Sequence, residues 1–108
     1  MLKPGDIVVT LFGYSDLSGA KIRPAFVVST ESYTSETGLV VLAAISSRAI
    51  RNRFEISLTD WRKAGLRLPS KVCVGKLMTV NVGLVKKIGS AINQDVNNIE
   101  RLLREAIM

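Results

Sequence analysis

Short runs of apolar residues alternate with polar, glycine-containing segments over most of the chain. Such runs are typical of short, partly buried β-strands. They predict strands at residues 7–12, 22–30, 39–45, 54–58, 72–74, 77–80 and 84–92. Gly75 separates two of these runs, and a glycine inside a strand pattern indicates a β-bulge.

The polar segments between the runs predict the connections. Residues 13–21 are polar with glycines near both ends, which favours a loop. Residues 31–38 are rich in serine and threonine and predict a hairpin connection. Thr59 or Asp60 has a side chain suited to capping a short helical turn, which Gly65 then ends.

The final segment has a different period. Asn93 is a good N-cap residue for a helix whose apolar residues recur every three or four positions. These residues form one helical face: Val96, Ile99, Leu102, Leu103, Ala106 and Ile107. About six short strands and one terminal helix predict an α+β, mainly β, fold, namely a small antiparallel barrel or curled sheet capped by the helix. Residues 1–108 are expected to form a single domain.

The composition narrows the classes of function. The net charge is +6, which favours a polyanionic partner such as nucleic acid or an acidic protein, although a solvated basic surface is the alternative. Histidine is absent and Cys73 is the single cysteine, so neither a tetrahedral zinc site nor a disulfide within the chain is expected. The glycines form no Walker or Rossmann pattern, and we expect no cofactor. No stretch approaches the roughly 20 apolar residues of a membrane span, so a cytoplasmic protein is expected.

Arg23 is the first candidate for chemistry. Pro24 disfavours helical geometry at Arg23 and holds it extended. Ala25 is small and would let a ligand approach the guanidinium, whose planar set of donors matches phosphate oxygens. The structural alternative is that Arg23 pairs with Asp6 or Asp16.

Ser46 and Ser47 follow the third apolar run. A hydroxyl at the end of a strand can donate to a phosphoryl oxygen, but it also commonly satisfies the backbone of a turn. Neither serine has a histidine partner or a G-x-S-x-G setting, which argues against a nucleophilic serine hydrolase.

A basic segment follows these serines. Arg48, Arg51 and Arg53, together with Lys21, form a candidate stripe that follows the phosphates of a nucleic acid. The aromatic candidates for base stacking are Tyr14, Tyr33 and Phe54. The alternatives are a solvated basic face and ordinary strand aromatics.

Ordered motifs extend over essentially the whole chain. They are Gly5-Asp6-Ile7-Val8, Tyr14-Ser15-Asp16, Lys21-Ile22-Arg23-Pro24-Ala25-Phe26-Val27-Val28-Ser29, Ala43-Ala44-Ile45-Ser46, Asp60-Trp61, Ala64-Gly65-Leu66, Pro69-Ser70, Lys76-Leu77-Met78-Thr79 and Ile88-Gly89. In this order they resemble the MazF/PemK family of toxin endoribonucleases. The resemblance implies an SH3-like, partly open antiparallel barrel with a C-terminal helix, acting as a homodimer.

The resemblance also implies an activity, which is sequence-specific cleavage of single-stranded mRNA without a metal ion. The family's key arginine falls on Arg23, and its hydroxyl residue falls on Ser46, with Ser47 as second choice. The loop at residues 13–21 would cover the RNA groove. The residues of this loop that are expected to contact RNA are Tyr14, Ser15, Asp16 and Lys21. A cognate antitoxin, often with an acidic tail, would block the same groove.

The sequence departs from the family pattern at Cys73 and Gly75. Many PemK-like members carry an arginine and an aspartate at these positions. Arginine is a poor general base, so the groups that transfer protons stay open. Two alternatives follow: a module of the same fold that binds RNA or an antitoxin without cleaving, and a toxin of this fold that poisons a protein such as gyrase.

Overall fold

A computed structural model describes residues 1–12 and 21–108, and its elements follow the predicted apolar runs closely. The elements are β1 (Asp6–Phe12), β2 (Lys21–Val27), α1 (Glu31–Thr37), β3 (Leu39–Ser46), β4 (Glu55–Ser57), β5 (Lys71–Asn81), the 3₁₀ turn η1 (Val82–Leu84), β6 (Val85–Ser90) and α2 (Asn93–Ile107). The predicted loop at residues 13–20 lies outside the described residues. No helix in the described part of the chain is both long enough and apolar enough to cross a membrane.

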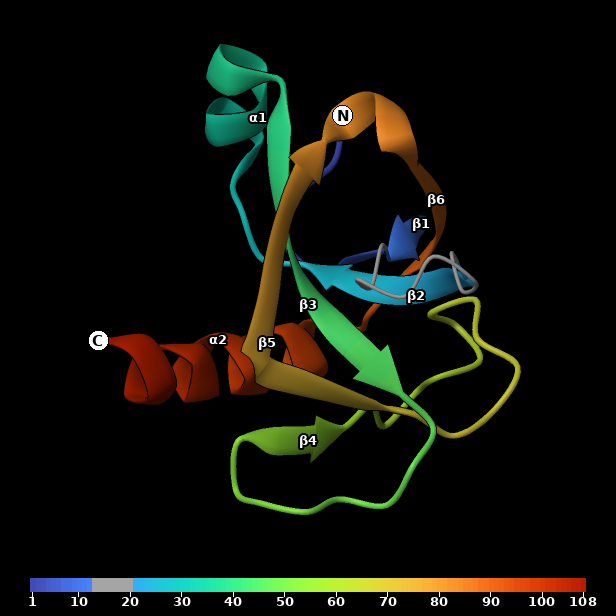
Figure 1. Cartoon of the computed structure of the whole chain (residues 1–108). Helices are drawn as coiled ribbons and strands as arrows, with labels where there is room; N and C mark the ends of the chain where they lie inside the picture. The colour runs from blue at the N-terminus through green and yellow to red at the C-terminus, as the bar shows by residue number, and fades with distance from the viewer. Residues whose placement is uncertain (13–20) are drawn as a thin grey trace.

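The strands form one six-stranded sheet in the order β4-β5-β3-β2-β1-β6, with every neighbouring pair antiparallel. The sheet curls strongly without closing, since β4 and β6 remain its edges, and α2 lies beneath it (Figure 1). This architecture confirms the predicted mainly β, partly open barrel with a C-terminal helix.

The curl gives the sheet two buried faces. Alternate residues of a strand point to opposite faces, so Ile7 and Phe26 pack in a cluster with Ile99 of α2. Val8 and Leu42 pack in a second cluster on the other face, where partly buried residues such as Val80 cover them. Both faces of the central strands are therefore apolar, as their nearly continuous apolar runs require.

Strand β5 bends sharply near its middle (Figure 1). Ala43 of β3 pairs with Leu77, whereas the next residue, Ala44, pairs with Cys73. Val74, Gly75 and Lys76 are the extra residues on the β5 side of this irregularity. The predicted bulge at Gly75 is confirmed, and the two runs that it separates form one bent strand instead of two.

The segment at residues 31–37 connects the antiparallel neighbours β2 and β3, as the predicted hairpin connection requires, but it forms a helix. The hydroxyl of Thr30 accepts a hydrogen bond from the amide of Tyr33 at 3.2 Å and caps the start of α1. Gly38 adopts the left-handed conformation with φ +72° and ends the helix. A capping threonine and a terminating glycine on either side of seven residues were the available signals.

The start of α2 also differs from the prediction. Ile92 is the N-cap residue, without a side-chain cap, and Asn93 is the first residue of the helix. Asp95 in the first turn is buried and accepts hydrogen bonds from the amide and the hydroxyl of Thr59, both at 2.9 Å. Asp95 therefore complements the positive end of the helix dipole and joins the helix to the turn at residues 59–65.

That turn lies directly against β6. Asp60 accepts from the amide of Lys63 at 3.1 Å, which confirms its capping role, and Gly65 ends the turn with φ +83°. A Cβ atom on Gly89 would lie 2.4 Å from the carbonyl carbon and oxygen of Ala64. Only glycine at this position lets the two backbones approach so closely.

Candidate functional site

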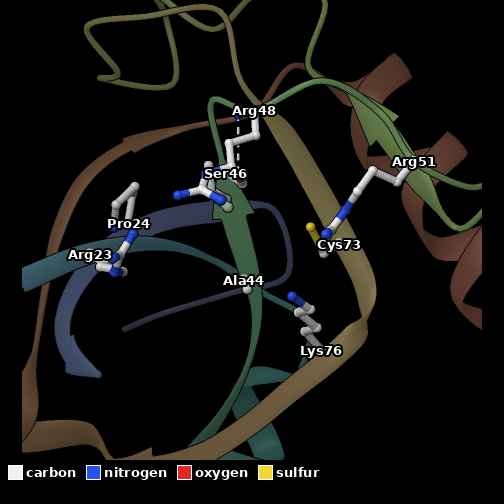
Figure 2. Close-up of a pocket in the computed structure, with 9 residues that line it drawn as sticks. Arg23, Pro24, Ala44, Ser46, Arg48, Arg51, Cys73 and Lys76 are labelled. Carbon is white, nitrogen blue, oxygen red and sulfur yellow. Dashed lines mark hydrogen bonds between the residues drawn. The ribbon is translucent and has the colours of Figure 1, made fainter. Parts of the chain in front are cut away.

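A pocket of about 250 Å³ lies where the ends of β2 and β3 meet the bend of β5. Its lining is Arg23, Pro24, Ala44, Ile45, Ser46, Arg48, Arg51, Cys73 and Lys76. Figure 2 shows these side chains converging from the two strands, from the loop after β3 and from β5. We call it the cationic pocket, because four of the lining residues that the structure describes carry positive charge and none of them is acidic.

Arg23 lies within β2, opposite Thr10 of β1, so its backbone is extended as predicted from Pro24. Its side chain is exposed and lines the pocket. The predicted role for Ala25 was wrong, because this residue is fully buried in the second core cluster and serves packing.

The proposed structural pairing of Arg23 with Asp6 is also wrong. Asp6 is buried and accepts from the amide of Lys3 at 3.0 Å and from the hydroxyl of Ser90 at 3.1 Å. Its ion-pair partner is Lys87, at 3.2 Å. Asp16, the other pairing considered for Arg23, lies outside the described residues.

Ser46 ends β3 on the wall of the pocket. Its Oγ accepts a hydrogen bond from the amide of Arg48 at 3.1 Å, which is drawn dashed in Figure 2. The hydroxyl therefore satisfies a turn, but accepting a bond leaves its own proton free to donate. Ser47 is exposed and lines a neighbouring pocket of about 620 Å³ rather than the cationic pocket.

The larger neighbouring pocket shares one wall with the cationic pocket. Arg23, Ser46 and Arg48 line both of them. The larger pocket is also lined by residues of the segment 65–70, which contributes Leu66 and Leu68 as well as Arg67. A ligand bound at the shared wall can therefore place a charged group in the cationic pocket and a less polar group near the leucines of the larger pocket.

The basic stripe predicted from the sequence divides in the structure. Arg48 and Arg51 are exposed and line the cationic pocket. Arg53 does not, because its guanidinium pairs with Glu105 of α2 at 3.0 Å and lies over the ring of Phe54, 4.3 Å from the ring centroid. The ring of Phe54 is thus already in contact with a cation.

The remaining predicted ligands lie elsewhere or outside the description. Tyr14, Ser15 and Asp16 lie outside the described residues. Lys21 begins β2, and its side chain is not described. Tyr33 lies on α1, which precedes β3 and is thus at the end of that strand remote from Ser46.

Lys76 was missed by the sequence reasoning. It is exposed and lies at the irregularity of β5, and its ammonium group points into the cationic pocket (Figure 2). The signal was the lysine next to Gly75, since an irregular strand changes the direction of neighbouring side chains. Among the described residues, no carboxylate forms an ion pair with Lys76, Arg23, Arg48 or Arg51.

Cys73 forms part of the pocket wall and is buried. Burial raises the pKa of its thiol, and the neighbouring Glu55 carboxylate raises it further. The thiol therefore stays protonated at neutral pH and is neither a nucleophile nor a general base. Within residues 1–12 and 21–108, no three His, Cys, Asp or Glu side chains cluster as metal ligands would.

The arrangement suits an anion with several oxygens. Guanidinium groups offer paired donors that fit phosphate, and an ammonium group adds a compact charge. The Ser46 hydroxyl provides a neutral donor between them. The pocket therefore has the donors and the charge to bind a phosphodiester and to stabilise added negative charge on it.

Comparison with known proteins gives two kinds of likeness. The model of the family described as PemK-like, MazF-like toxin of type II toxin–antitoxin system matches residues 3–107. The chain is also similar to a MazE–MazF crystal structure from Deinococcus radiodurans, with 22% identity, a TM-score of 0.78 and coverage of 96% of this chain and 94% of that one. No curated protein matches the sequence.

Two mycobacterial structures show the same fold. One is an endoribonuclease in complex with its cognate antitoxin from a mycobacterial species, with 17% identity, a TM-score of 0.78 and coverage of 99% and 95%. The other is the Mycobacterium tuberculosis toxin MazF-mt6, with 22% identity, a TM-score of 0.70 and coverage of 94% and 91%. These likenesses confirm the fold that the resemblance implied.

Proposed function

The chain belongs to the PemK-like, MazF-like toxin family of type II toxin–antitoxin systems, and from this membership we propose that it is an endoribonuclease that cleaves single-stranded mRNA without a metal ion. The observation that carries the proposal is the convergence of Arg23 and Ser46 on one pocket lined by four cationic side chains. The family resemblance implies that the key arginine and the hydroxyl residue are at these two positions, which supports the proposal.

The proposed reaction is an internal transfer of the phosphoryl group. The 2′-oxygen of the ribose attacks the neighbouring phosphorus and forms a new P–O bond, while the bond to the 5′-oxygen breaks. The 2′-hydroxyl loses its proton and the 5′-oxygen gains one. The products are a 2′,3′-cyclic phosphate and a 5′-hydroxyl.

Negative charge grows on the non-bridging oxygens during this attack. Donors aimed at those oxygens lower the barrier because they bind the transition state more strongly than the substrate. We assign this role to the Arg23 guanidinium and to the free proton of Ser46, with Ser47 as the alternative hydroxyl. Arg48, Arg51 and Lys76 would hold the phosphates on either side.

Proton transfer is assigned to solvent water. The thiol of Cys73 is held protonated, as its raised pKa implies. Arginine does not release its proton at neutral pH. The pocket is open to solvent, so water can accept the proton of the 2′-hydroxyl and supply one to the leaving oxygen.

The proposed partners are single-stranded RNA, a cognate acidic antitoxin and a second copy of the chain, and the proposed location is the cytoplasm. The net charge of +6 complements both polyanionic RNA and an acidic peptide. The Deinococcus radiodurans MazF was solved with MazE, and a mycobacterial endoribonuclease with its cognate antitoxin. An antitoxin that covers the cationic pocket would exclude RNA.

The test is cleavage of a long single-stranded RNA by the purified chain in EDTA. We expect fragments with cyclic phosphate ends, and at least a 100-fold lower rate for Arg23→Ala, because one removed donor of this kind costs about 10²–10³ in rate. The matched control is Arg104→Ala, which removes the same charge from an exposed position on α2 outside the pocket. Intact RNA at micromolar protein, or equal cutting by Arg23→Ala, would contradict the proposal.

A second candidate is a binding module that no longer cleaves. It is favoured by the lining of the cationic pocket, which contains no carboxylate among residues 1–12 and 21–108. A Cβ atom on Gly75 would have no neighbour within 4 Å, so the backbone leaves open space where a side chain would begin. If the chain binds RNA without cutting it and Gly75→Asp cuts, the second candidate is the correct one.

A further inference from the structure

The loop at residues 47–54 carries two of the four cations of the pocket. It connects β3 to β4 and has no regular secondary structure. Arg48 and Arg51 are exposed, and no carboxylate in the described residues forms an ion pair with either of them. The side chains of Arg48 and Arg51 therefore form no ion pair that would hold the loop backbone in position, and other contacts must do so.

A buried ion pair lies directly behind this loop. The ammonium group of Lys71 on β5 is 2.6 Å from Oε1 of Glu55 on β4, and the two side chains are 3% and 5% exposed. Hydrogen bonds from Lys71 and from the amide of Arg51 lower the pKa of Glu55, so the carboxylate is ionised at neutral pH. The two charges of the ion pair cancel each other, so the electrostatic potential in the pocket is set by the exposed cations.

Each member of the pair also binds the loop backbone. Lys71 Nζ donates to the carbonyl oxygen of Ala49 at 2.7 Å. Glu55 Oε1 accepts from the amide of Arg51 at 2.8 Å. The two contacts therefore lie next to Arg48 and at Arg51 itself.

We propose that Glu55 and Lys71 are positioning residues whose buried ion pair fixes the loop that presents Arg48 and Arg51 to the cationic pocket. The inference rests on the proposed function, since it assigns a role in binding the RNA phosphates. A buried ion pair is a poor stabiliser, because an apolar pair of similar size often serves the fold equally well. An apolar pair, however, binds neither the carbonyl group at position 49 nor the amide at position 51.

The fixed loop matters for affinity. Long basic side chains on a free loop lose conformational entropy when they bind phosphate, whereas a loop that is already ordered loses less. The two backbone contacts thus prepare Arg48 and Arg51 for binding before RNA arrives.

The test replaces both members of the pair by apolar residues of similar size in Glu55→Leu/Lys71→Met. The control is Lys87→Met, which removes a lysine from the ion pair with Asp6, away from the cationic pocket. Binding is measured with a DNA-substituted oligonucleotide that lacks the attacking 2′-hydroxyl and cannot be cleaved. Urea unfolding of each variant confirms that it is folded.

We expect the double variant to bind about tenfold more weakly, and its plot of log K against log salt to be shallower by about 1.4, the contribution of two phosphate contacts on a single strand. For RNA cleavage, KM should rise more than kcat falls. Glu55→Gln keeps an acceptor for the Arg51 amide and should bind within about threefold of the wild type. A folded double variant with wild-type affinity and salt slope would overturn the inference.

Hydrogen exchange in the wild-type chain gives an independent measurement. The Arg51 amide should exchange more slowly than the exposed amides of the same loop, and exchange at the exposed rate would also overturn the inference. This measurement decides the question even if the double variant does not fold. A wild-type chain that binds no oligonucleotide, yet protects the Arg51 amide, would count against the proposed function and not against the role of the pair in holding the loop.

Discussion

Charged side chains have opposite surroundings in two neighbouring regions of this molecule. In the cationic pocket, Arg23, Arg48, Arg51 and Lys76 line a solvent-open cavity, and none of the described residues in its wall is acidic. Behind the pocket and under the sheet, the buried carboxylates are fully engaged by donors of the protein. The comparison separates charges that hold the fold from charges that remain available to a ligand.

The difference has a physical basis. A buried charge without a partner is costly, so carboxylates in the core accept several hydrogen bonds or pair with lysine. Exposed cations gathered in one place repel each other and contribute nothing to folding that would explain their grouping. The unpaired group is therefore the one that points to a polyanionic ligand.

The largest expected effect on the buried side comes from Asp95→Ala. The variant loses the two hydrogen bonds from Thr59 and an acidic group in the first turn of α2. We expect a loss of about 2–3 kcal/mol in the free energy of unfolding, because hydrogen bonds to charged groups are the stronger ones. Urea titration measures it, and RNA cleavage per folded molecule should be unchanged. Asp95→Asn, which keeps one acceptor oxygen, should lose less.

The next effect concerns pH. Hydrogen bonds from Lys71 and from the Arg51 amide lower the pKa of Glu55 below its ordinary value of 4.5. A group whose pKa is lower in the folded state stabilises the fold above its unfolded pKa, and this contribution is lost as the pH falls through the folded pKa. Thermal unfolding from pH 7 to pH 2 should show the melting temperature falling below about pH 4.5. In Glu55→Gln the fall should be smaller, and equal slopes would contradict the assignment.

On the exposed side, Lys76→Ala should weaken RNA binding without affecting the fold. The loss of one phosphate contact is expected to lower affinity about three- to tenfold and to make the salt dependence shallower by about 0.7. The free energy of unfolding should change by less than about 0.5 kcal/mol, as is usual for exposed positions. Titration of a labelled oligonucleotide at several salt concentrations measures both quantities. An unchanged salt slope would remove Lys76 from the RNA ligands.

The smallest effect on RNA binding is expected from Arg53→Ala. This variant allows a paired and an unpaired arginine of the same loop to be compared. Arg53 already pairs with Glu105, whereas Arg51 lines the pocket. Arg51→Ala should therefore weaken RNA binding several-fold more than Arg53→Ala does. The exposed pair with Glu105 is expected to contribute less than about 1 kcal/mol to stability. Equal losses of RNA affinity in the two variants would show that the ion pair with Glu105 does not keep Arg53 from binding RNA.

Local patterns predicted most of the fold. Apolar runs located the central strands because both of their faces are buried, and three-to-four periodicity located α2 because that helix buries one face. The helix α1 was missed since its serine and threonine residues also suit a turn, and the decisive signals were the cap at Thr30 and the glycine at position 38. The N-cap is Ile92 and not Asn93, and Asp95, which binds Thr59 of the neighbouring turn, joins the start of the helix to the rest of the fold.

The site was less accessible from sequence than the fold. Pro24 and the end of the third apolar run identified Arg23 and Ser46, and both line the cationic pocket. Lys76 lines the pocket because the pairing of β5 with β3 is irregular at this point. The contact of Lys71 with Glu55 joins residues that are 16 positions apart in the sequence. Such contacts depend on strand register and on side-chain partners, which a linear pattern does not specify.

The close contact between Ala64 and Gly89 sets a limit on the larger pocket. Gly65, Leu66 and Ile88 all belong to the lining of that pocket, and beside them the main chain of Ala64 lies directly against the main chain at Gly89. Side chains can rotate to admit a bulky guest, but two abutting main chains have no such freedom. The position of the main chain on this side of the pocket is therefore set by the architecture, and a change of ligand preference has to come from the side chains that line it.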